Sequence, residues 1–467
     1  MRIGLVGPSY NQRSLPFDAQ RTINLFPVFD EQGKEVAALY GTPGLEYFTA
    51  AGAGPIRACF ASTNGRAFVI SGASVYEIDS AGVATSRGTL NTTTGNCTID
   101  ENPTQMFICD GDDAYTLVYS SNTFAQVTDG DFPSSVGTGT YLNGYFIVNQ
   151  NTTGKFYISS LNDGTAWAAL DYATAESSPD KLVRVIRAVG QLWLFGNKTL
   201  EIWTNNGGAA FPFQRISGAE TAMGIMAAHT AVELGGSLFW VGENTDGGGV
   251  VYRANGFRPQ RVSTEAIEIA IAAATDKANM KAMSYQADGH DFYILTGGGL
   301  ATTLVYDIAT NLWHERAYLT IAGDLEQHIM SCSMYAFGYH IVGDRRNGNL
   351  YKMKIDVYSD NGDEIARERI FTHLSNENER TRYNKLQVGF ETGVGLQSGQ
   401  GSSPTVSLHL SKDGARTWSM GYPASIGAVG KYQTSVVFRR LGIAEQMTFK
   451  LRITDPVKIS IVGAYLK

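Results

Sequence analysis

Residues 190–207, GQLWLFGNKTLEIWTNNG, contain the pattern that decides the fold. An apolar and aromatic run, LWLF, leads into a turn with Gly and Asn, and a second run, LEIWT, follows it. Two short runs of this kind separated by turn residues are typical of a β-hairpin. We therefore predict a pair of antiparallel strands over this stretch.

The same hairpin unit recurs along the chain at intervals of roughly 40 to 50 residues. The other copies begin at Asn64, Asn102, Asn143, Gly235, Asp288 and Gly338. A further strand usually precedes each hairpin, as in PIRACFAS and VRVIRA, and another follows it. Four strands per repeat match the blade of a β-propeller, whose closed ring buries both faces of every sheet. The repeat predicts an all-β fold with a propeller of about seven blades, six or eight being possible, over residues 55–356.

Two segments lie outside this repeat within the first part of the chain. Residues 1–54 precede the first hairpin and are expected to form an N-terminal arm and leading strands. Residues 264–283, TEAIEIAIAAATDKANMKAM, are rich in Ala and have apolar residues at helical spacing, with Thr264 as the N-cap. They predict one short surface helix between blades.

The pattern changes after Asp356 to strict alternation of apolar and polar residues. Val406, Leu408 and Leu410 fall on one face of a strand, and the run from Phe449 to Ile453 repeats this spacing. Residues 357–467 are therefore predicted to form a separate C-terminal β-sandwich. The Gly- and Ser-rich tract at 393–404 is expected to be a loop inside it.

Composition and charge argue against several classes of function. Charged residues make up 17% of the chain and the formal net charge is −7. Without a strongly basic stretch, a DNA-wrapping or groove-reading protein is not expected. The four Cys residues have no metal-ligand spacing and are expected to be buried thiols of a protein made in a reducing cytoplasm. The sequence contains no signal peptide or membrane-length apolar run, so a protein without a membrane span is expected.

Residues 411–418, SKDGARTW, nearly match the Asp-box hairpin of sialidase-type propellers. In such a turn Asp413 accepts hydrogen bonds from backbone N–H groups, Gly414 takes a conformation that is costly for other residues, and Trp418 packs beneath. Ala415 stands where the Asp-box usually has glycine. Because the motif occurs once and outside the repeat, we interpret it as a structural turn formed by Ser411, Asp413, Gly414, Thr417 and Trp418.

No catalytic, cofactor-binding or metal-binding residue is predicted. A glycosidase needs two carboxylates placed on either side of the bond it cleaves. The acidic residues considered for this role are scattered over predicted turns: Asp110, Asp112, Asp113, Glu201, Glu220 and Glu243. The stretches GDDAY and NTDGGG resemble parts of calcium loops, but turns are rich in these residues anyway. His314 is interpreted as a packed strand residue rather than a base.

Four segments together resemble a known family. They are INLFPV at 23–28, LYGTPGLEYF at 39–48, the block at 177–207, and FKLRITDPVKISIVGA at 449–464. Their order and spacing are similar to those of the packaged-DNA stabilisation protein of short-tailed bacteriophages, also called the tail hub or nozzle, a head-to-tail accessory factor. The resemblance covers nearly the whole chain.

The resemblance implies a structural virion protein of the phage tail, made in the cytoplasm of the host bacterium. It implies a homo-hexameric ring below the portal and adaptor rings that retains packaged DNA and anchors the tail needle and the tailspikes or tail fibres. Double-stranded DNA would pass through its lumen without sequence-specific binding. Two alternatives stay open: a carbohydrate-binding or sugar-degrading propeller acting as a receptor-binding tail protein, and a peptide-binding scaffold.

Charge gives a further expectation for such a ring. Clustered Lys and Arg along the lumen would bind phosphate and slow DNA ejection. We therefore expect a neutral or acidic channel wall. The pairs Arg345–Arg346 and Arg439–Arg440 are expected at contacts with other subunits or partners.

Overall fold

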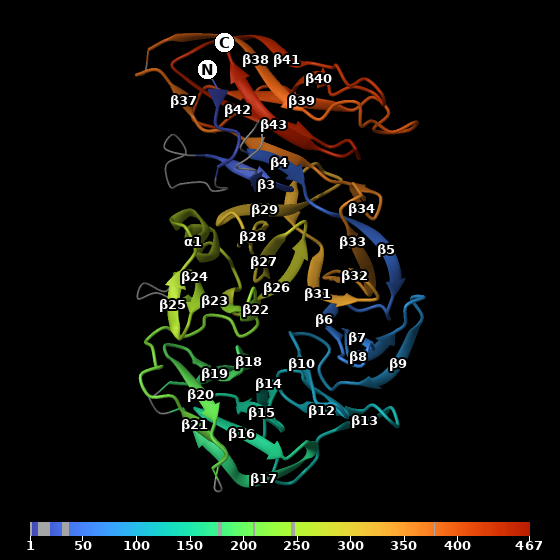
Figure 1. Ribbon diagram of the computed structural model, residues 1–467, viewed down its shortest axis with the longest axis vertical. Coiled ribbons are helices and arrows are strands. Elements are labelled where there is room, and N and C mark those ends of the chain that lie inside the picture. The colour runs from blue at the N-terminus through green and yellow to red at the C-terminus, as the bar shows by residue number, and fades with distance from the viewer. Residues whose placement is uncertain are drawn as a thin grey trace.

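Seven four-stranded antiparallel blades form a ring in the computed structural model, five of them as separate sheets and two as parts of larger sheets, and a second β-domain lies against one side of the ring (Figure 1). The structure describes residues 2–7, 19–29, 37–175, 180–208, 211–243, 248–377 and 379–467. Within these residues the number of blades, seven, confirms the prediction of an all-β propeller with about seven blades.

Blades one to three follow one another directly in the chain. Their strands are β6 (Ile56–Ala61), β7 (Ala67–Ser71), β8 (Ser74–Ile78) and β9 (Ala84–Thr89); β10 (Thr98–Glu101), β11 (Gln105–Cys109), β12 (Ala114–Val118) and β13 (Thr123–Gln126); and β14 (Val136–Leu142), β15 (Tyr145–Gln150), β16 (Lys155–Ser160) and β17 (Asp163–Thr174).

Blades four to six continue the same order. Their strands are β18 (Leu182–Ala188), β19 (Gln191–Gly196), β20 (Leu200–Asn205) and β21 (Phe213–Arg215); β22 (Val232–Leu234), β23 (Ser237–Glu243), β24 (Gly249–Asn255) and β25 (Arg258–Arg261); and β26 (Met280–Ala287), β27 (His290–Gly297), β28 (Thr303–Asp307) and β29 (Leu312–Leu319). A short strand, β30 (Leu325–Gln327), extends β29.

The second strand of each blade explains why the ring is stable. All five residues of β7 are buried, as are almost all residues of β19 and β23. These strands are continuous apolar runs rather than alternating ones, because both faces of a blade pack against neighbouring blades. Seven apolar clusters lie between successive blades, and one of them, with Val69 and Ile341, joins blade seven to blade one. Hydrophobic burial is therefore continuous around the ring.

Blade seven combines strands from both ends of the propeller sequence. It contains β31 (Met330–Ala336), β32 (Tyr339–Asp344), β33 (Asn349–Lys354) and β5 (Gly44–Ala50). Strand β5 pairs antiparallel with β33, with Leu45 opposite Met353. A strand from the predicted N-terminal arm thus supplies the outermost strand of the last blade and closes the ring.

The predicted helix is present but shorter than the segment that suggested it. Helix α1 spans Glu265–Ala272, preceded by Thr264, and a 3-10 turn, η1 (Lys277–Asn279), leads into β26. Ile267 and Ile271 are buried in the cluster between blades five and six. The helix covers that junction, and the last residues of the segment form a strand because they begin blade six.

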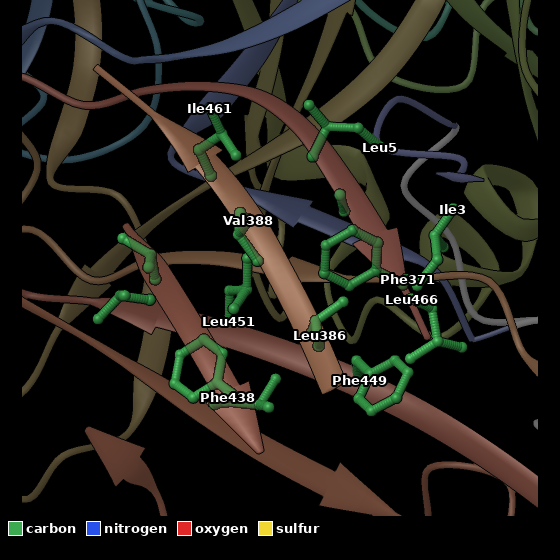
Figure 2. Packing of buried hydrophobic residues seen from close by; sticks show 14 of the residues in the cluster. Ile3, Leu5, Phe371, Leu386, Val388, Phe438, Phe449, Leu451, Ile461 and Leu466 are labelled. Atoms are coloured by element: carbon green, nitrogen blue, oxygen red, sulfur yellow. The ribbon is translucent and has the colours of Figure 1, made fainter. Parts of the chain in front are cut away.

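The C-terminal domain is a two-sheet sandwich, which confirms the predicted class. Its strands are β36 (Arg367–Ile370), β37 (Leu374–Ser375), β38 (Thr381–Phe390), β39 (Thr405–Ser411), β40 (Tyr422–Ser425), β41 (Val436–Ala444), β42 (Gln446–Ile453) and β43 (Ser460–Leu466), joined by β1 (Arg2–Ile3), β3 (Leu25–Phe29) and β4 (Ala37–Gly41) from the N-terminal region. Figure 2 shows the core, in which Phe449 and Leu451 face Leu386 and Val388. The alternation read from the sequence therefore marks the buried faces.

One sheet passes without interruption from the propeller into the sandwich. Strand β2 (Arg21–Ile23) pairs parallel with β29 of blade six and antiparallel with β36, which pairs with β42. A small hairpin, β34 (Ser359–Asp360) and β35 (Asp363–Glu364), also pairs with β5. Backbone hydrogen bonds therefore hold the two domains together. The residue boundaries at 54 and 356 stay a prediction.

Candidate functional site

The Asp-box-like turn connects β39 to β40 in the sandwich and is held by hydrogen bonds. The Asp413 carboxylate accepts the backbone N–H groups of Arg416 and Thr417 at 3.0 Å and the Thr417 hydroxyl at 2.6 Å. The Ser411 hydroxyl donates to Asp413 at 2.7 Å and accepts the N–H of Ala415 at 2.9 Å. The donors from Thr417 and Ser411 hold the pKa of Asp413 well below its usual range. All these partners belong to the turn, so its polar groups are used locally.

The backbone at Gly414 and Ala415 accounts for the residue types in this turn. Gly414 has a φ of +74° and Ala415 a φ of +66°. Both values lie in the left-handed region, which a glycine adopts without steric cost. The Asp-box usually has glycine at the second position, so Ala415 carries strain there.

Trp418 differs from the expectation of a buried plug. The side chain is only partly buried, and the Lys450 ammonium lies 4.8 Å from the centre of its indole ring. This is cation–π geometry at a surface, not core packing. The sandwich core is formed by other residues, such as Leu408 and Phe449.

The six acidic residues considered for catalysis lie on three blades and their connections. Asp110 is buried and accepts the Thr92 hydroxyl at 2.8 Å and the backbone N–H groups of Asp112 and Asp113. Glu201 accepts the indole N–H of Trp203 at 2.8 Å, and Glu220 accepts the N–H of Gly218. Glu243 is exposed at the end of β23. The described contacts of Asp110, Glu201 and Glu220 therefore order turns and strands. Most of the NTDGGG stretch, residues 244–247, lies outside the described residues.

His314 is a packed strand residue, as predicted. It is 1% exposed in β29, and Phe292 contacts its ring edge-on. Burial lowers the pKa of His314 to about 3. Its ring is therefore neutral at physiological pH and lies inside blade six.

The largest feature that the sequence did not indicate is a cavity of about 770 Å³ at the centre of the propeller. The first strands of several blades line it, including β6, β22, β26 and β31, which surround the centre of the ring in Figure 1. Polar and charged side chains of these strands line the cavity together with apolar ones. The cavity is thus a candidate binding site.

The cavity has more basic than acidic side chains although the chain is acidic overall. Arg57, Arg184 and Lys281 line it together with His229, and Glu233 is the acidic residue of the lining. Burial lowers the pKa of Arg184 to about 10 and lowers the pKa values of His229 and Lys281. Arg57 donates to the carbonyls of Gly95 and Gly72 at 2.8 and 2.9 Å, so it braces the connection between blades one and two. Among the described residues no carboxylate forms an ion pair with Arg184 or Lys281.

The two arginine pairs have different environments. Arg346 forms an ion pair with Asp344 at 3.1 Å and lies over the Tyr318 ring, and Arg345 donates to the carbonyls of Gln327 and His328. This first pair therefore binds Asp344 of its own blade seven and residues of the neighbouring blade six, Tyr318 and Gln327. Arg439 and Arg440 are exposed on β41, at the edge of a sandwich sheet.

The fold is a seven-bladed propeller joined to a β-sandwich by a shared sheet. Two family models divide the chain in the same way. Residues 1–358 match the model described as bacteriophage P22 Gp10, beta-propeller, and residues 366–467 match bacteriophage P22 Gp10, beta-sandwich. The chain belongs to the phage P22 Gp10 family, whose members are structural proteins that stabilise packaged DNA at the phage tail.

A search of curated proteins found no match. Among solved structures, the chain is similar to the extracellular domain of the putative hybrid two component system BT4673 from B. thetaiotaomicron, at 11% identity and a TM-score of 0.46 over 78% of this chain and 45% of that one. It thus spans less than half the length of that structure. The Pan2 WD40 domain of Neurospora crassa aligns at 9% identity and a TM-score of 0.44, covering 67% of this chain and 96% of that domain.

Two further observations concern membranes and metals. No helix in the part of the chain that the structure describes is long and apolar enough to cross a bilayer. Within the same residues, no group of three or more His, Cys, Asp or Glu side chains has the geometry to hold a metal ion.

Proposed function

We propose that this protein is the tail hub of a short-tailed phage and forms a homo-hexameric ring below the portal and adaptor, where it retains packaged DNA and anchors the tail needle and tailspikes or tail fibres. The observation that carries the proposal is the match of both domains, in order, to one family of tail proteins. The protein would be made in the host cytoplasm and function in the virion. DNA would cross the lumen without sequence-specific contacts.

The architecture supports an assembly role. A propeller leaves only short, protected sheet edges and presents many loops on a rigid frame. The continuous sheet through β29, β2 and β36 joins the two domains by backbone pairing, which favours a fixed angle between them. Ring subunits bind one another by heterologous contacts that close around an axis. A rigid subunit keeps the angle between those contacts constant, which closure requires.

The sandwich offers a surface for such contacts. Arg439 and Arg440 are exposed on the edge strand β41, and Met420 and Tyr432 are 90% and 72% exposed in loops of the same domain. Aromatic, Met and Arg side chains are enriched in protein interfaces. We propose that contacts with partners or other subunits form here. We also expect the wall of the ring lumen to be neutral to acidic, because the net charge of the chain is −7.

We propose a non-enzymatic role, which the family of structural proteins supports. The carboxylates of Asp110, Glu201 and Asp413 accept hydrogen bonds from their own turns and strands, as expected for structural residues. The alternative is a receptor-binding tail protein that binds or cleaves host carbohydrate. The turn at residues 411–418 is the feature that suggested it, and its polar groups are used within the turn.

Mass photometry of the full chain with a purified portal–adaptor complex tests the assembly. We expect the mass of the complex to increase by that of six copies of the protein. Complexes with one to five bound copies should be rare. The double variant Arg439→Glu/Arg440→Glu should weaken this binding without lowering the melting temperature, because both side chains are exposed. Arg416→Glu, also an exposed arginine of the sandwich, is the matched control. A single bound copy, or no binding to the platform, would refute the ring.

A further inference from the structure

Two cysteines lie in contact where the ring closes. Cys59 belongs to β6 of blade one and Cys332 to β31 of blade seven. Their Sγ atoms are 2.8 Å apart, although the residues are 273 positions apart in the sequence. The pair therefore connects the first and last blades at the inner edge of the ring, opposite the outer edge that β5 closes.

Both thiols are accessible from the central cavity. Cys59 and Cys332 are partly exposed and line its wall, as does the Lys281 side chain. The Ser331 hydroxyl lies 3.6 Å from the Cys332 sulfur. A small solute that enters the cavity can thus reach the sulfur pair without unfolding of the ring. Cys97 also borders the cavity but is buried, and Cys109 is buried away from it.

The surroundings of the pair lower the pKa of the Cys332 thiol and raise that of the Cys59 thiol. Burial raises the pKa of Cys332, but the hydrogen bond from Cys59, the Lys281 ammonium and the Ser331 hydroxyl outweigh it, and the net shift is downward. Burial raises the pKa of Cys59 well above its usual value, and its hydrogen bond to Cys332 adds to this. Burial also raises the pKa of Cys97, to about 12, so that thiol stays protonated. Thiolates in electropositive, partly exposed surroundings are the reactive ones.

We propose that Cys59 and Cys332 are a redox-active dithiol that a peroxide oxidises to a disulfide, which fastens blade one to blade seven. The Cys332 thiolate attacks one peroxide oxygen and breaks the O–O bond, giving a sulfenic acid and one water after protonation. The Cys59 sulfur then displaces the hydroxyl, forms the S–S bond and releases a second water. Two thiols are oxidised and one hydrogen peroxide is reduced to two waters.

The disulfide would change how the ring opens. Blades one and seven carry the two ends of the propeller sequence, and non-covalent contacts such as that of Val69 and Ile341 join their faces. A bond that closes so long a loop removes much conformational freedom from the unfolded chain. The oxidised protein should therefore resist unfolding more than the reduced protein. This chemistry does not depend on the tail role.

Peptide mapping of the full chain tests the proposal. The native protein is treated with hydrogen peroxide, denatured, alkylated and digested without reduction. We expect one linked peptide pair containing Cys59 and Cys332, lighter by two hydrogen atoms than the two free peptides, with Cys97 and Cys109 alkylated. The melting temperature should rise by about 5 °C and return to the starting value with dithiothreitol.

Two variants separate the dithiol from general oxidation. Cys332→Ser should abolish both the linked peptide and the rise in melting temperature, whereas Cys97→Ser should keep both. If a variant folds poorly, the peptide map of the unsubstituted protein still tests whether Cys59 and Cys332 form a disulfide. Unreacted thiols after peroxide treatment, a sulfinic or sulfonic acid at Cys332 without a linked peptide, or a link that involves Cys97 or Cys109 would each overturn the proposal.

Discussion

Trp240→Ala should lower the free energy of unfolding by about 3–5 kcal/mol. Trp240 is fully buried in β23 and packs against Phe195 and Tyr252, with ring centres 5.3 and 5.7 Å away. These rings fill the junction between blades four and five. Removal of the indole leaves a cavity that two rigid sheets cannot close. Urea denaturation, followed by circular dichroism, measures the loss.

Two controls test whether burial is the cause. Trp418→Ala removes the same side chain from a partly exposed site on the sandwich and should cost far less, about 1 kcal/mol. Trp240→Phe should retain most of the stability, because the Trp240 Nε1 has no hydrogen-bond partner among the described residues. Equal losses for Trp240→Ala and Trp418→Ala would contradict the assignment of blade packing as the main source of stability.

Asn24→Ala is expected to lower the free energy of unfolding by about 3 kcal/mol, since it leaves several buried backbone groups unpaired. Asn24 is 1% exposed and lies between β2 and β3 with a φ of +53°. Its amide donates to the carbonyls of Ala317 and Ala366 at 2.9 and 2.8 Å and accepts the Ala317 N–H at 3.0 Å. One side chain thus ties blade six to the segment that enters the sandwich.

Asn143→Ala is the matched control for this variant. Asn143 has a φ of +50° in the hairpin turn of blade three, and its side chain is exposed. The substitution introduces a similar left-handed strain without breaking buried hydrogen bonds, so we expect a loss of about 1 kcal/mol. Thermal melting of both variants gives the comparison. Similar losses would mean that the Asn24 contacts do not hold the domains together.

The hairpin repeat and the later alternation were sufficient to predict the propeller and the sandwich. Both patterns are local, because a strand such as β19 or β42 shows its buried faces in its own residues. The role of β5 was not predicted. Leu45 pairs with Met353, and nothing in the sequence around Leu45 marks a partner that distant. The same holds for β2, which is three residues long and pairs with strands from two domains.

In the candidate site, too, local contacts could be predicted from the sequence and long-range contacts could not. The hydrogen bonds of the turn at residues 411–418 could be anticipated, because all their donors and acceptors lie within a few residues. The partial exposure of Trp418 could not, since it depends on where β42 places Lys450. The contact of Cys59 with Cys332 exists only because the ring closes. Inner strands with Arg or Lys among apolar residues, such as Arg57 in PIRACFAS and Lys281 in MKAMSYQ, were the available signal for the basic cavity.

The sheet that runs from blade six into the sandwich fits a load-transmitting subunit. Glu315 of β29 binds Arg21 of β2 at 2.9 Å, beside the backbone pairing of these strands. Force on the sandwich would therefore be carried into the propeller through paired strands rather than through a flexible linker. This connection fits the role of the family, whose members stabilise packaged DNA.

The most direct test of the account is the fate of DNA in phage particles assembled without this protein. The measurement is the fraction of packaged genome that becomes sensitive to added nuclease over time, compared with particles supplied with the protein in trans. The account predicts that heads fill with DNA and then lose it, and that the supplied protein prevents the loss. Particles that keep their genomes and fail only to adsorb to cells would contradict it and favour a receptor-binding role.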